Sequence, residues 1–257
     1  GIPVIKSRVS NIDGYRGILT YRGYKIQELA EKCSYEDLSF LLLHEDLPLP
    51  EEQQDLQKRF LTNKELERDI ANSIVAISDD LHPMNMLSAG ILMMQSTDET
   101  AMDVDNYRQN MRRCIRVIAK FPTILGVFRN DDPDFAKGES FDSFAQYCLY
   151  CFNKELAQKQ DWVNVFEKML ILHADHTMNN STFSARAVGS AQASIYSSIS
   201  TAINSLSGPL HGGANERVIL MLQEINSPEK VEEYVDDKLK NRKKIMGIGH
   251  RVYKTYD

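Results

Sequence analysis

The sequence predicts a mainly α-helical fold, and three observations support that prediction. Apolar residues recur at three- and four-residue spacings through most of the chain after residue 25, as amphipathic helices require. Gly, Pro, Asn and Ser interrupt this pattern often enough to separate helices of ordinary length. β-forming residues gather instead near the amino terminus. We therefore expect a multi-helical bundle that carries a short N-terminal β hairpin.

The composition is that of an ordinary globular protein and excludes several classes. The 257 residues carry a net charge of −6 with acids and bases interspersed, so we expect no nucleic-acid surface. No apolar run approaches the ~20 residues of a membrane span, and no secretory signal begins the chain. We therefore expect a cytoplasmic protein. Because the first residue is not Met, we also expect that its start lies upstream or has been removed.

The amino-terminal half predicts the hairpin and then a series of helices. Asp13-Gly14, set among β-forming residues in segment 4–24, is typical of a tight hairpin turn. Ser34 and Asp37 have the spacing of a capping box. Helices are expected near residues 26–30, from 34 to the prolines at 48 and 50, and over 51–63, 66–78, 86–95 and 111–129, the last bent at Pro122 and followed by a polar loop over 130–142.

Small side chains dominate a long segment of the second half. A helix that begins at Trp162 carries an inward apolar stripe that continues to His173. The Asn179–Thr182 cluster then breaks this helix and caps the next, which we expect to run from Phe183 to Leu206. Its many Ala, Ser and Gly residues permit close approach, as at the centre of a bundle or at a subunit interface.

A histidine at a tight turn follows this segment. Gly208-Pro209 must stop the helix, and Gly212-Gly213 allow backbone angles that other residues resist. The helical pattern resumes at Ala214, so the N–H groups of a helix start lie near His211. This environment suits a neutral imidazole that donates a hydrogen bond to a developing oxyanion. A solvated histidine in a plain helix–helix turn is the alternative.

The composition changes after this turn. A strongly charged helix is expected over residues 227–241, and a basic, glycine-containing segment follows over 242–254. We therefore predict a large helical domain over residues 1–215 and the start of a smaller domain over 216–257.

Three other motifs favour structural interpretations. Cys148 and Cys151 lie among aromatic residues, which indicates buried helical thiols rather than a zinc site. The pair His173 and His176 lacks the further ligands that zinc needs, although a metal-binding protein stays open as an alternative. His82 before a proline is more typical of a packed loop residue than of a catalytic one.

Three histidine motifs together carry a family resemblance. His173-Ala-Asp-His176, Ser207-Gly-Pro-Leu-His211-Gly-Gly-Ala-Asn215 and Gly247-Ile-Gly-His250-Arg-Val-Tyr-Lys254 resemble the motifs of citrate synthases in order and separation. Asp13-Gly14, Tyr21-Arg22-Gly23-Tyr24 and His82-Pro83-Met84 resemble that family's amino-terminal half. The resemblance implies a mainly α-helical, citrate-synthase-like homodimer, in which a smaller domain closes over the substrates.

The resemblance also implies an activity and residue roles. The reaction is the condensation of acetyl-CoA with oxaloacetate to citrate and CoA, with no cofactor and no metal. His211 would bind the thioester oxygen as the methyl group loses a proton, and His250 would polarise the ketone of oxaloacetate. Substrate-binding residues would be His176, Asn180, Asn215 and Arg251. CoA-binding residues would be Lys243, Lys244, Ile245, Met246, Gly247, Ile248 and Gly249.

The sequence departs from the family at its end, and alternatives remain. The family's catalytic aspartate and oxaloacetate-binding arginines would lie outside this chain, so we expect a sequence truncated at both ends and inactive by itself. A 2-methylcitrate synthase, which uses propionyl-CoA, is the nearest alternative. From another class, the chain would be a non-catalytic helical dimerisation or binding module.

Overall fold

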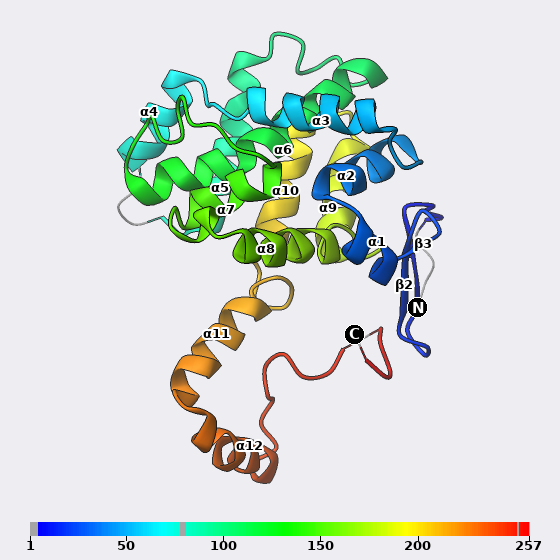
Figure 1. Cartoon of the computed structure of the whole chain (residues 1–257), viewed down its shortest axis with the longest axis vertical. Coiled ribbons are helices and arrows are strands. Elements are labelled where there is room, and N and C mark those ends of the chain that lie inside the picture. Colours follow the sequence, from blue (N-terminus) through cyan, green and yellow to red (C-terminus); the bar gives the residue numbers. More distant parts are fainter. Residues whose placement is uncertain (1–4, 78–80, 251, 257) are drawn as a thin grey trace.

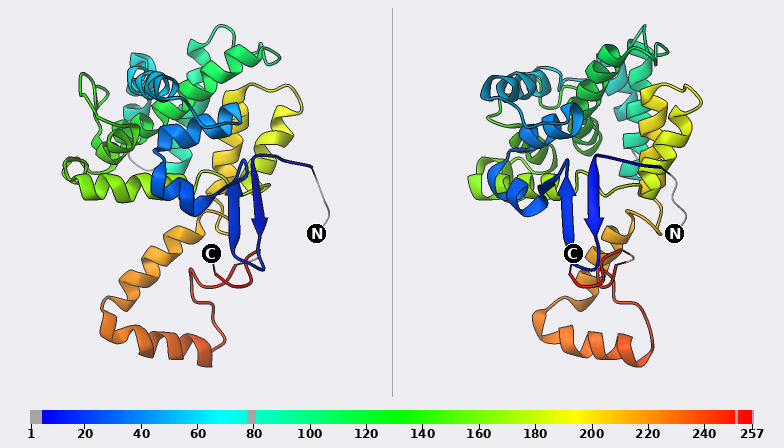
Figure 2. Two further views of the ribbon diagram at one scale, coloured as in Figure 1. Left: turned by 45° about the vertical axis from the view of Figure 1, so that its right-hand side comes forward. Right: turned by 90° about the vertical axis from the view of Figure 1, so that its right-hand side faces the viewer.

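A computed structural model describes residues 5–77, 81–250 and 252–256. Most helices form a bundle, and a small β-sheet lies at its edge (Figure 1). The chain after α10 leaves the bundle, makes two further helices, and returns so that its carboxyl end lies beside the sheet in all the views (Figures 1 and 2). The predicted mainly α-helical class is confirmed.

The sheet contains the predicted hairpin and one further strand. Strands β1 (Ser10–Asp13) and β2 (Ile18–Tyr21) are antiparallel, and β3 (Tyr24–Lys25) continues the sheet in the order β1-β2-β3. The turn begins at Asp13, whose Oδ1 accepts hydrogen bonds from the backbone N–H groups of Tyr15 and Arg16. Side-chain acceptance of this kind is why Asp favours turn starts.

The helices follow the predicted order. Their bounds are α1 Ile26–Lys32, α2 Tyr35–His44, α3 Pro50–Thr62, α4 Arg68–Ile77, α5 Pro83–Met93, α6 Tyr107–Asn130, α7 Phe144–Phe152, α8 Gln160–Leu172, α9 Asn180–Gly189, α10 Ile195–Leu206, α11 Ala214–Ile225 and α12 Val231–Lys240, with short 3-10 turns η2 Met94–Thr97, η3 Leu156–Gln158 and η4 Pro228–Lys230. The Ser34 capping box is confirmed. Helix α6 begins before residue 111 because Asn106 caps it, and Pro122 lies inside it.

Of three buried clusters among the described residues, the two larger ones hold together the elements that carry the site. The larger joins α3 to α7 and α10, and the side chains of Phe60, Tyr147 and Tyr196 in it are fully buried. The smaller lies between β2, α1, α2 and α8, and contains Tyr21, Leu38 and Ile171. The second cluster fixes the sheet to the carboxyl end of α8, where the first histidine motif begins.

The predicted helix from Phe183 to Leu206 is wrong, because two helices occupy this stretch. Helix α9 ends at Gly189, Gln192 adopts a left-handed conformation (φ 60°), and Ser194 caps α10 by accepting from Ser197 N. The hydroxyl-rich sequence offers side-chain caps that compete with a continuous helix. Helix α10 packs against both α9 and α5, which agrees with the prediction that small residues bring helices close.

The predicted inward position of His173 is also wrong. The chain leaves the helix at this residue (φ −102°, ψ 4°), and the side chain is exposed. Its Nδ1 lies 2.7 Å from the carbonyl oxygen of Met169, so the imidazole closes the last turn of α8.

The prediction of buried helical thiols is confirmed. Cys148 and Cys151 are buried free thiols in α7, and burial raises the pKa of both. The prediction of a packed His82 is wrong, because this residue is exposed at the start of α5. It caps that helix by accepting from Met84 N through Nδ1, and its Nε2 lies 3.8 Å from a carboxylate oxygen of Glu216 in α11. Within the described ranges, no helix is both long and apolar enough to cross a bilayer.

Candidate active site

Two of the three predicted histidines lie against each other. The ring centroids of His176 and His250 are 5.3 Å apart in an edge-on arrangement. Tyr253 completes the cluster, with its ring 5.7 Å from His176 and 4.9 Å from His250. His176 follows α8, whereas His250 and Tyr253 lie in the returning carboxyl-terminal segment. The fold therefore joins motifs from distant parts of the sequence.

The backbone after His250 orients its imidazole. Nδ1 of His250 lies 3.0 Å from Val252 N and 3.1 Å from Tyr253 N, and both N–H groups donate to it. A ring nitrogen that accepts hydrogen bonds carries no proton, so the proton of the neutral ring lies on Nε2. In this tautomer, Nε2 is a hydrogen-bond donor.

The sheet holds the loop that carries His176. The hydroxyl of Tyr21 donates to Asp175 O at 2.8 Å and accepts from Asp175 N at 3.2 Å. Burial raises the pKa of Tyr21 to about 12, so this phenol stays protonated and can serve both functions. On the other side of His176, Thr177 has the left-handed φ of 57°, and its N–H is shared by Ser10 Oγ and Asp175 Oδ2, each 3.0 Å away. Ser10 Oγ in turn donates to Asp175 Oδ2.

The hairpin turn also receives the carboxyl-terminal segment. Lys254 N donates to Gly14 O at 2.7 Å. A Cβ on Gly14 would lie 2.2 Å from Val252 O, and one on Gly17 would lie 2.9 Å from the ring of Tyr256. These close approaches explain why the turn carries glycine at both positions.

His211 lies in the loop between α10 and α11 and contacts α9. Its Nε2 is 3.0 Å from Ser181 Oγ, and its backbone N–H donates to Gly208 O at 2.9 Å. The contacts of the described residues do not bring His211 against the other two imidazoles. The stop after Leu206 and the helix from Ala214 are both as predicted.

The reason predicted for Gly212 and Gly213 is wrong. Neither residue is among those with positive φ, and Gly213 has φ −60°. Instead, a Cβ on Gly212 would lie 2.7 Å from Leu206 O, and one on Gly213 would lie 3.0 Å from Ser207 O. The glycines permit the chain to pass close to the end of α10.

The remaining predicted site residues are spread over three elements. Asn180 begins α9, and its Nδ2 donates to Ser205 Oγ on α10 at 2.7 Å. Asn215 is exposed in the first turn of α11. Arg251 lies outside the described residues.

The predicted CoA-binding segment forms a loop after α12. Lys243 and Lys244 are exposed, Ile245 and Met246 are half-buried, and Gly247, Ile248 and Gly249 are exposed. Gly247 (φ 79°) and Gly249 (φ 86°) have positive φ, which favours glycine. A Cβ on Gly247 would lie 3.3 Å from Val218 Cγ2, so this loop passes close to α11.

Sequence reasoning missed three residues that the geometry brings to the site. Tyr253 belongs to the third histidine motif, but its spacing does not indicate the ring contact with His176. Ser181 is predicted only as part of a helix cap, although its side chain contacts His211. Ser10 gave no signal, because its partners lie 165 and 167 residues further along the chain.

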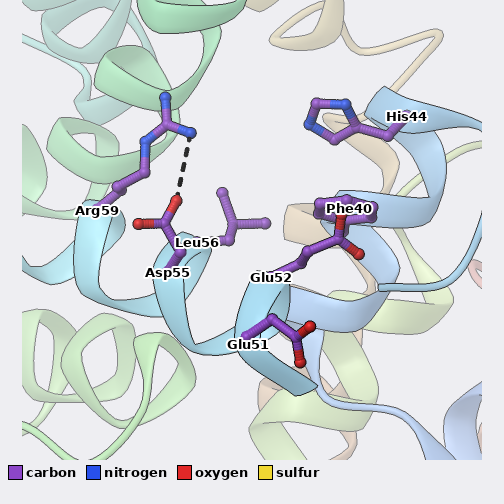
Figure 3. A pocket seen from close by; sticks show the side chains of 7 residues that line it. All are labelled: Phe40, His44, Glu51, Glu52, Asp55, Leu56 and Arg59. Carbon is purple, nitrogen blue, oxygen red and sulfur yellow. Dashed lines mark ion pairs between the residues drawn. The ribbon is translucent and has the colours of Figure 1, made fainter. Parts of the chain in front are cut away.

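An open pocket lies elsewhere on the molecule, and none of these three histidines lines it. It has a volume of about 400 Å³ between α2 and α3. Figure 3 shows its lining, in which Phe40 and His44 come from α2, the other five side chains come from α3, and Arg59 pairs with Asp55. Among the residues that the structure describes, no group of three or more His, Cys, Asp and Glu side chains could hold a metal ion.

Comparisons with known proteins give a consistent picture. The family model described as citrate synthase, C-terminal domain, matches residues 1–257. The chain is 38% identical to the citrate synthase of Synechocystis sp. over 265 residues, and this alignment covers 100% of the chain and 65% of that protein. It is 34% identical to the 2-methylcitrate synthase of Mycobacterium tuberculosis, with 100% of this chain and 65% of that protein covered.

A solved structure gives the same result at the level of the fold. The citrate synthase of Thermoplasma acidophilum, solved as a ternary complex with carboxymethyl coenzyme A and oxaloacetate, superposes with a TM-score of 0.82 at 27% identity. The match covers 100% of this chain and 68% of that chain. The similarity therefore extends over every element described above.

Proposed function

The chain belongs to the citrate synthase family, and on that premise we propose that it carries the histidine part of an active site that condenses acetyl-CoA with oxaloacetate to citrate and CoA. One observation carries the proposal, namely the contact between the rings of His176 and His250 at 5.3 Å. Two imidazoles brought together from distant loops, one of them with a fixed tautomer, form a site for an oxygen-rich substrate.

The first role in this proposal is electrophilic. His250 donates from Nε2 to the ketone oxygen of oxaloacetate and supports the alkoxide as the new carbon–carbon bond forms. Its two backbone donors hold the ring in that tautomer before substrate arrives. His176 binds a carboxylate of the same substrate, together with Asn180, Asn215 and Arg251.

The second role concerns the thioester. His211 donates a hydrogen bond to the thioester oxygen while the methyl group loses its proton, so that the enolate charge is neutralised in part. Proton removal also needs a base, to which we assign no residue. The 243–249 loop binds CoA, because two exposed lysines beside two glycines with positive φ suit a phosphate-bearing ligand.

The assembly is also part of the proposal. Helix α9 has no buried residue and exposes Phe183, which suits contact with a second copy of the chain in a homodimer. Residues 1–215 form the large domain and 216–257 the start of a smaller one. Free cysteines throughout the chain agree with a reducing compartment such as the cytoplasm.

The test measures CoA release by the full-length gene product with acetyl-CoA and oxaloacetate. His250→Gln should lower kcat by roughly 100-fold or more, since it removes a donor to the developing alkoxide. His173→Gln is the matched control, because that imidazole is exposed and bonds its own helix. Wild-type rates equal to those of an enzyme-free blank would contradict the proposal.

A second candidate follows from the similarity to a 2-methylcitrate synthase. The ratio of kcat/KM for propionyl-CoA to that for acetyl-CoA separates the two, and a ratio above one would favour the longer acyl group. A non-catalytic module would bind neither oxaloacetate nor CoA.

A further inference from the structure

We propose that the N-terminal hairpin assembles the two-histidine cluster, with Ser10 and Gly14 as the positioning residues for His176 and His250. This inference deepens the proposed function and rests on it where turnover is concerned. Neither histidine lies in a helix or strand, so each depends on contacts made by its neighbours.

Ser10 fixes the backbone on the far side of His176. Thr177 is not a glycine, yet it holds φ 57°, which is unfavourable for a β-branched residue. The hydroxyl of Ser10 accepts from Thr177 N and donates to the carboxylate of Asp175, so it links both neighbours of His176. The direction of the His176 side chain follows from this backbone, and Nε2 of that ring is buried without a partner among the described residues.

Gly14 fixes the segment after His250. Its carbonyl accepts from Lys254 N, and its missing side chain leaves room for the carbonyl of Val252, which a Cβ would approach to 2.2 Å. Val252 N is one of the two donors to Nδ1 of His250. Displacement of Val252 therefore changes the orientation of the imidazole directly.

The contacts of Ser10 and those of Gly14 both start from β1 and the turn after it. Ser10 begins β1, and Gly14 follows directly after its last residue. Because a strand and its tight turn are stiff, the distance between these residues sets the distance between the segments that carry the two imidazoles. Ser10 and Gly14 are half-buried and lie outside the buried residues of the main cluster, so positioning rather than core packing accounts for their contacts.

The experiment uses the full-length protein, two substitutions at Ser10 and one control substitution just before β1. Ser10→Ala should lower kcat/KM for oxaloacetate by roughly 10- to 100-fold, as expected when a substrate-binding group is misplaced. Ser10→Thr, which keeps the hydroxyl, should restore most of it. Ser7→Ala is the matched control, because Ser7 is exposed and its side chain accepts only a local bond from Val9 N.

A second pair of variants tests the contacts of Gly14. Gly14→Ala should lower kcat by a similar factor and move the Cε1–H resonance of His250 in the NMR spectrum. Tyr15→Ala is its control, since Tyr15 lies in the same turn with its side chain 83% exposed. Ser10→Ala should move the resonance of His176 instead.

A double-mutant cycle links Ser10 to the backbone strain. Glycine adopts the left-handed conformation readily, so Ser10→Ala should have a smaller effect in a Thr177→Gly background. An equal effect in both backgrounds would overturn the positioning role of Ser10.

The outcomes separate this inference from the proposed function. If the wild type has no synthase activity but Ser10→Ala moves the His176 resonance, the activity assignment fails and the positioning role stands. If the wild type is active and Ser10→Ala and Gly14→Ala match their controls in both kinetics and spectra, the positioning role is overturned. A loss of folding in Ser10→Ala would also overturn it, since a core role would then explain the contacts.

Discussion

Replacement of Asp98 by Ala should be one of the most destabilising single changes in the bundle. Asp98 follows η2, and its carboxylate pairs with Arg113 of α6 at 2.8 Å, with side chains only 13% and 4% exposed. It also accepts from the hydroxyl of Tyr196 on α10 at 3.0 Å. One carboxylate thus joins a loop and two core helices.

The magnitude follows from the charge state. Burial alone would raise the pKa of Asp98, but hydrogen bonds from Arg113, Thr100 and Tyr196 outweigh it and lower the pKa from 3.8 to about 2. At 1.36 kcal/mol per pKa unit, this fall corresponds to about 2 kcal/mol in favour of the folded carboxylate. Asp98→Ala also leaves the buried guanidinium without its counter-charge, and such losses cost about 3–5 kcal/mol.

We expect a loss of about 3 kcal/mol, at the lower end of that range. Arg113 keeps neutral acceptors at Thr100, at the Asp103 carbonyl and at Asn110. Urea unfolding followed by circular dichroism measures the change, with an unchanged m-value as the condition for comparison. At about 2–4 °C per kcal/mol for a chain of this size, the thermal midpoint should fall by about 6–12 °C.

Asp105→Ala is the matched control in the same loop. Asp105 is exposed, and its side chain makes no hydrogen bond or ion pair among the described residues. Its loss should change the unfolding free energy by less than about 0.5 kcal/mol. If Asp98→Ala also stayed within that limit, the reasoning from burial and charge would be refuted.

Three further predictions concern the pH dependence of Asp98 and two other sites. The pKa of Asp98 is lowered in the folded state, so its stabilisation is complete above the unfolded value of 3.8 and is lost as the pH falls through about 2. Urea midpoints between pH 5 and pH 2 should therefore decline less in Asp98→Asn than in the wild type. Gly90→Ala should destabilise the fold by about 1–3 kcal/mol in the same assay, because the new Cβ would lie 2.7 Å from Ile124 Cγ2. Ser181→Ala removes the hydroxyl 3.0 Å from Nε2 of His211 and should lower kcat roughly tenfold in the CoA-release assay, with little change in KM for oxaloacetate.

Local rules predicted most of the secondary structure. The hairpin turn at Asp13-Gly14, the capping box at Ser34 and the stop before Gly208-Pro209 depend on residues within a few positions of each other, so one stretch of sequence contains the whole cause. The break between α9 and α10 was missed because no Gly or Pro marks residues 190–194. A left-handed glutamine makes the turn instead.

Only part of the site was predicted from the sequence. Resemblance of motifs placed His176 and His250 in one site, and the ring contact agrees with it. The residues that orient them, Ser10 and Gly14, form their contacts with partners that no spacing rule connects to them. Pairing over such separations is decided by the packing of the whole bundle, which a pattern of apolar residues does not specify.

The same separation sets an order of events during synthesis. Ser10 leaves the ribosome well before Asp175, its partner 165 residues later, and at about 5–20 residues per second the interval is roughly 8–33 s. Through that time the inner face of the hairpin, with Tyr21 on it, lacks the loop that covers it in the folded chain. The nascent hairpin consequently waits for its partners in the folded chain, and the two imidazoles meet only after the segment that carries His250 has been translated.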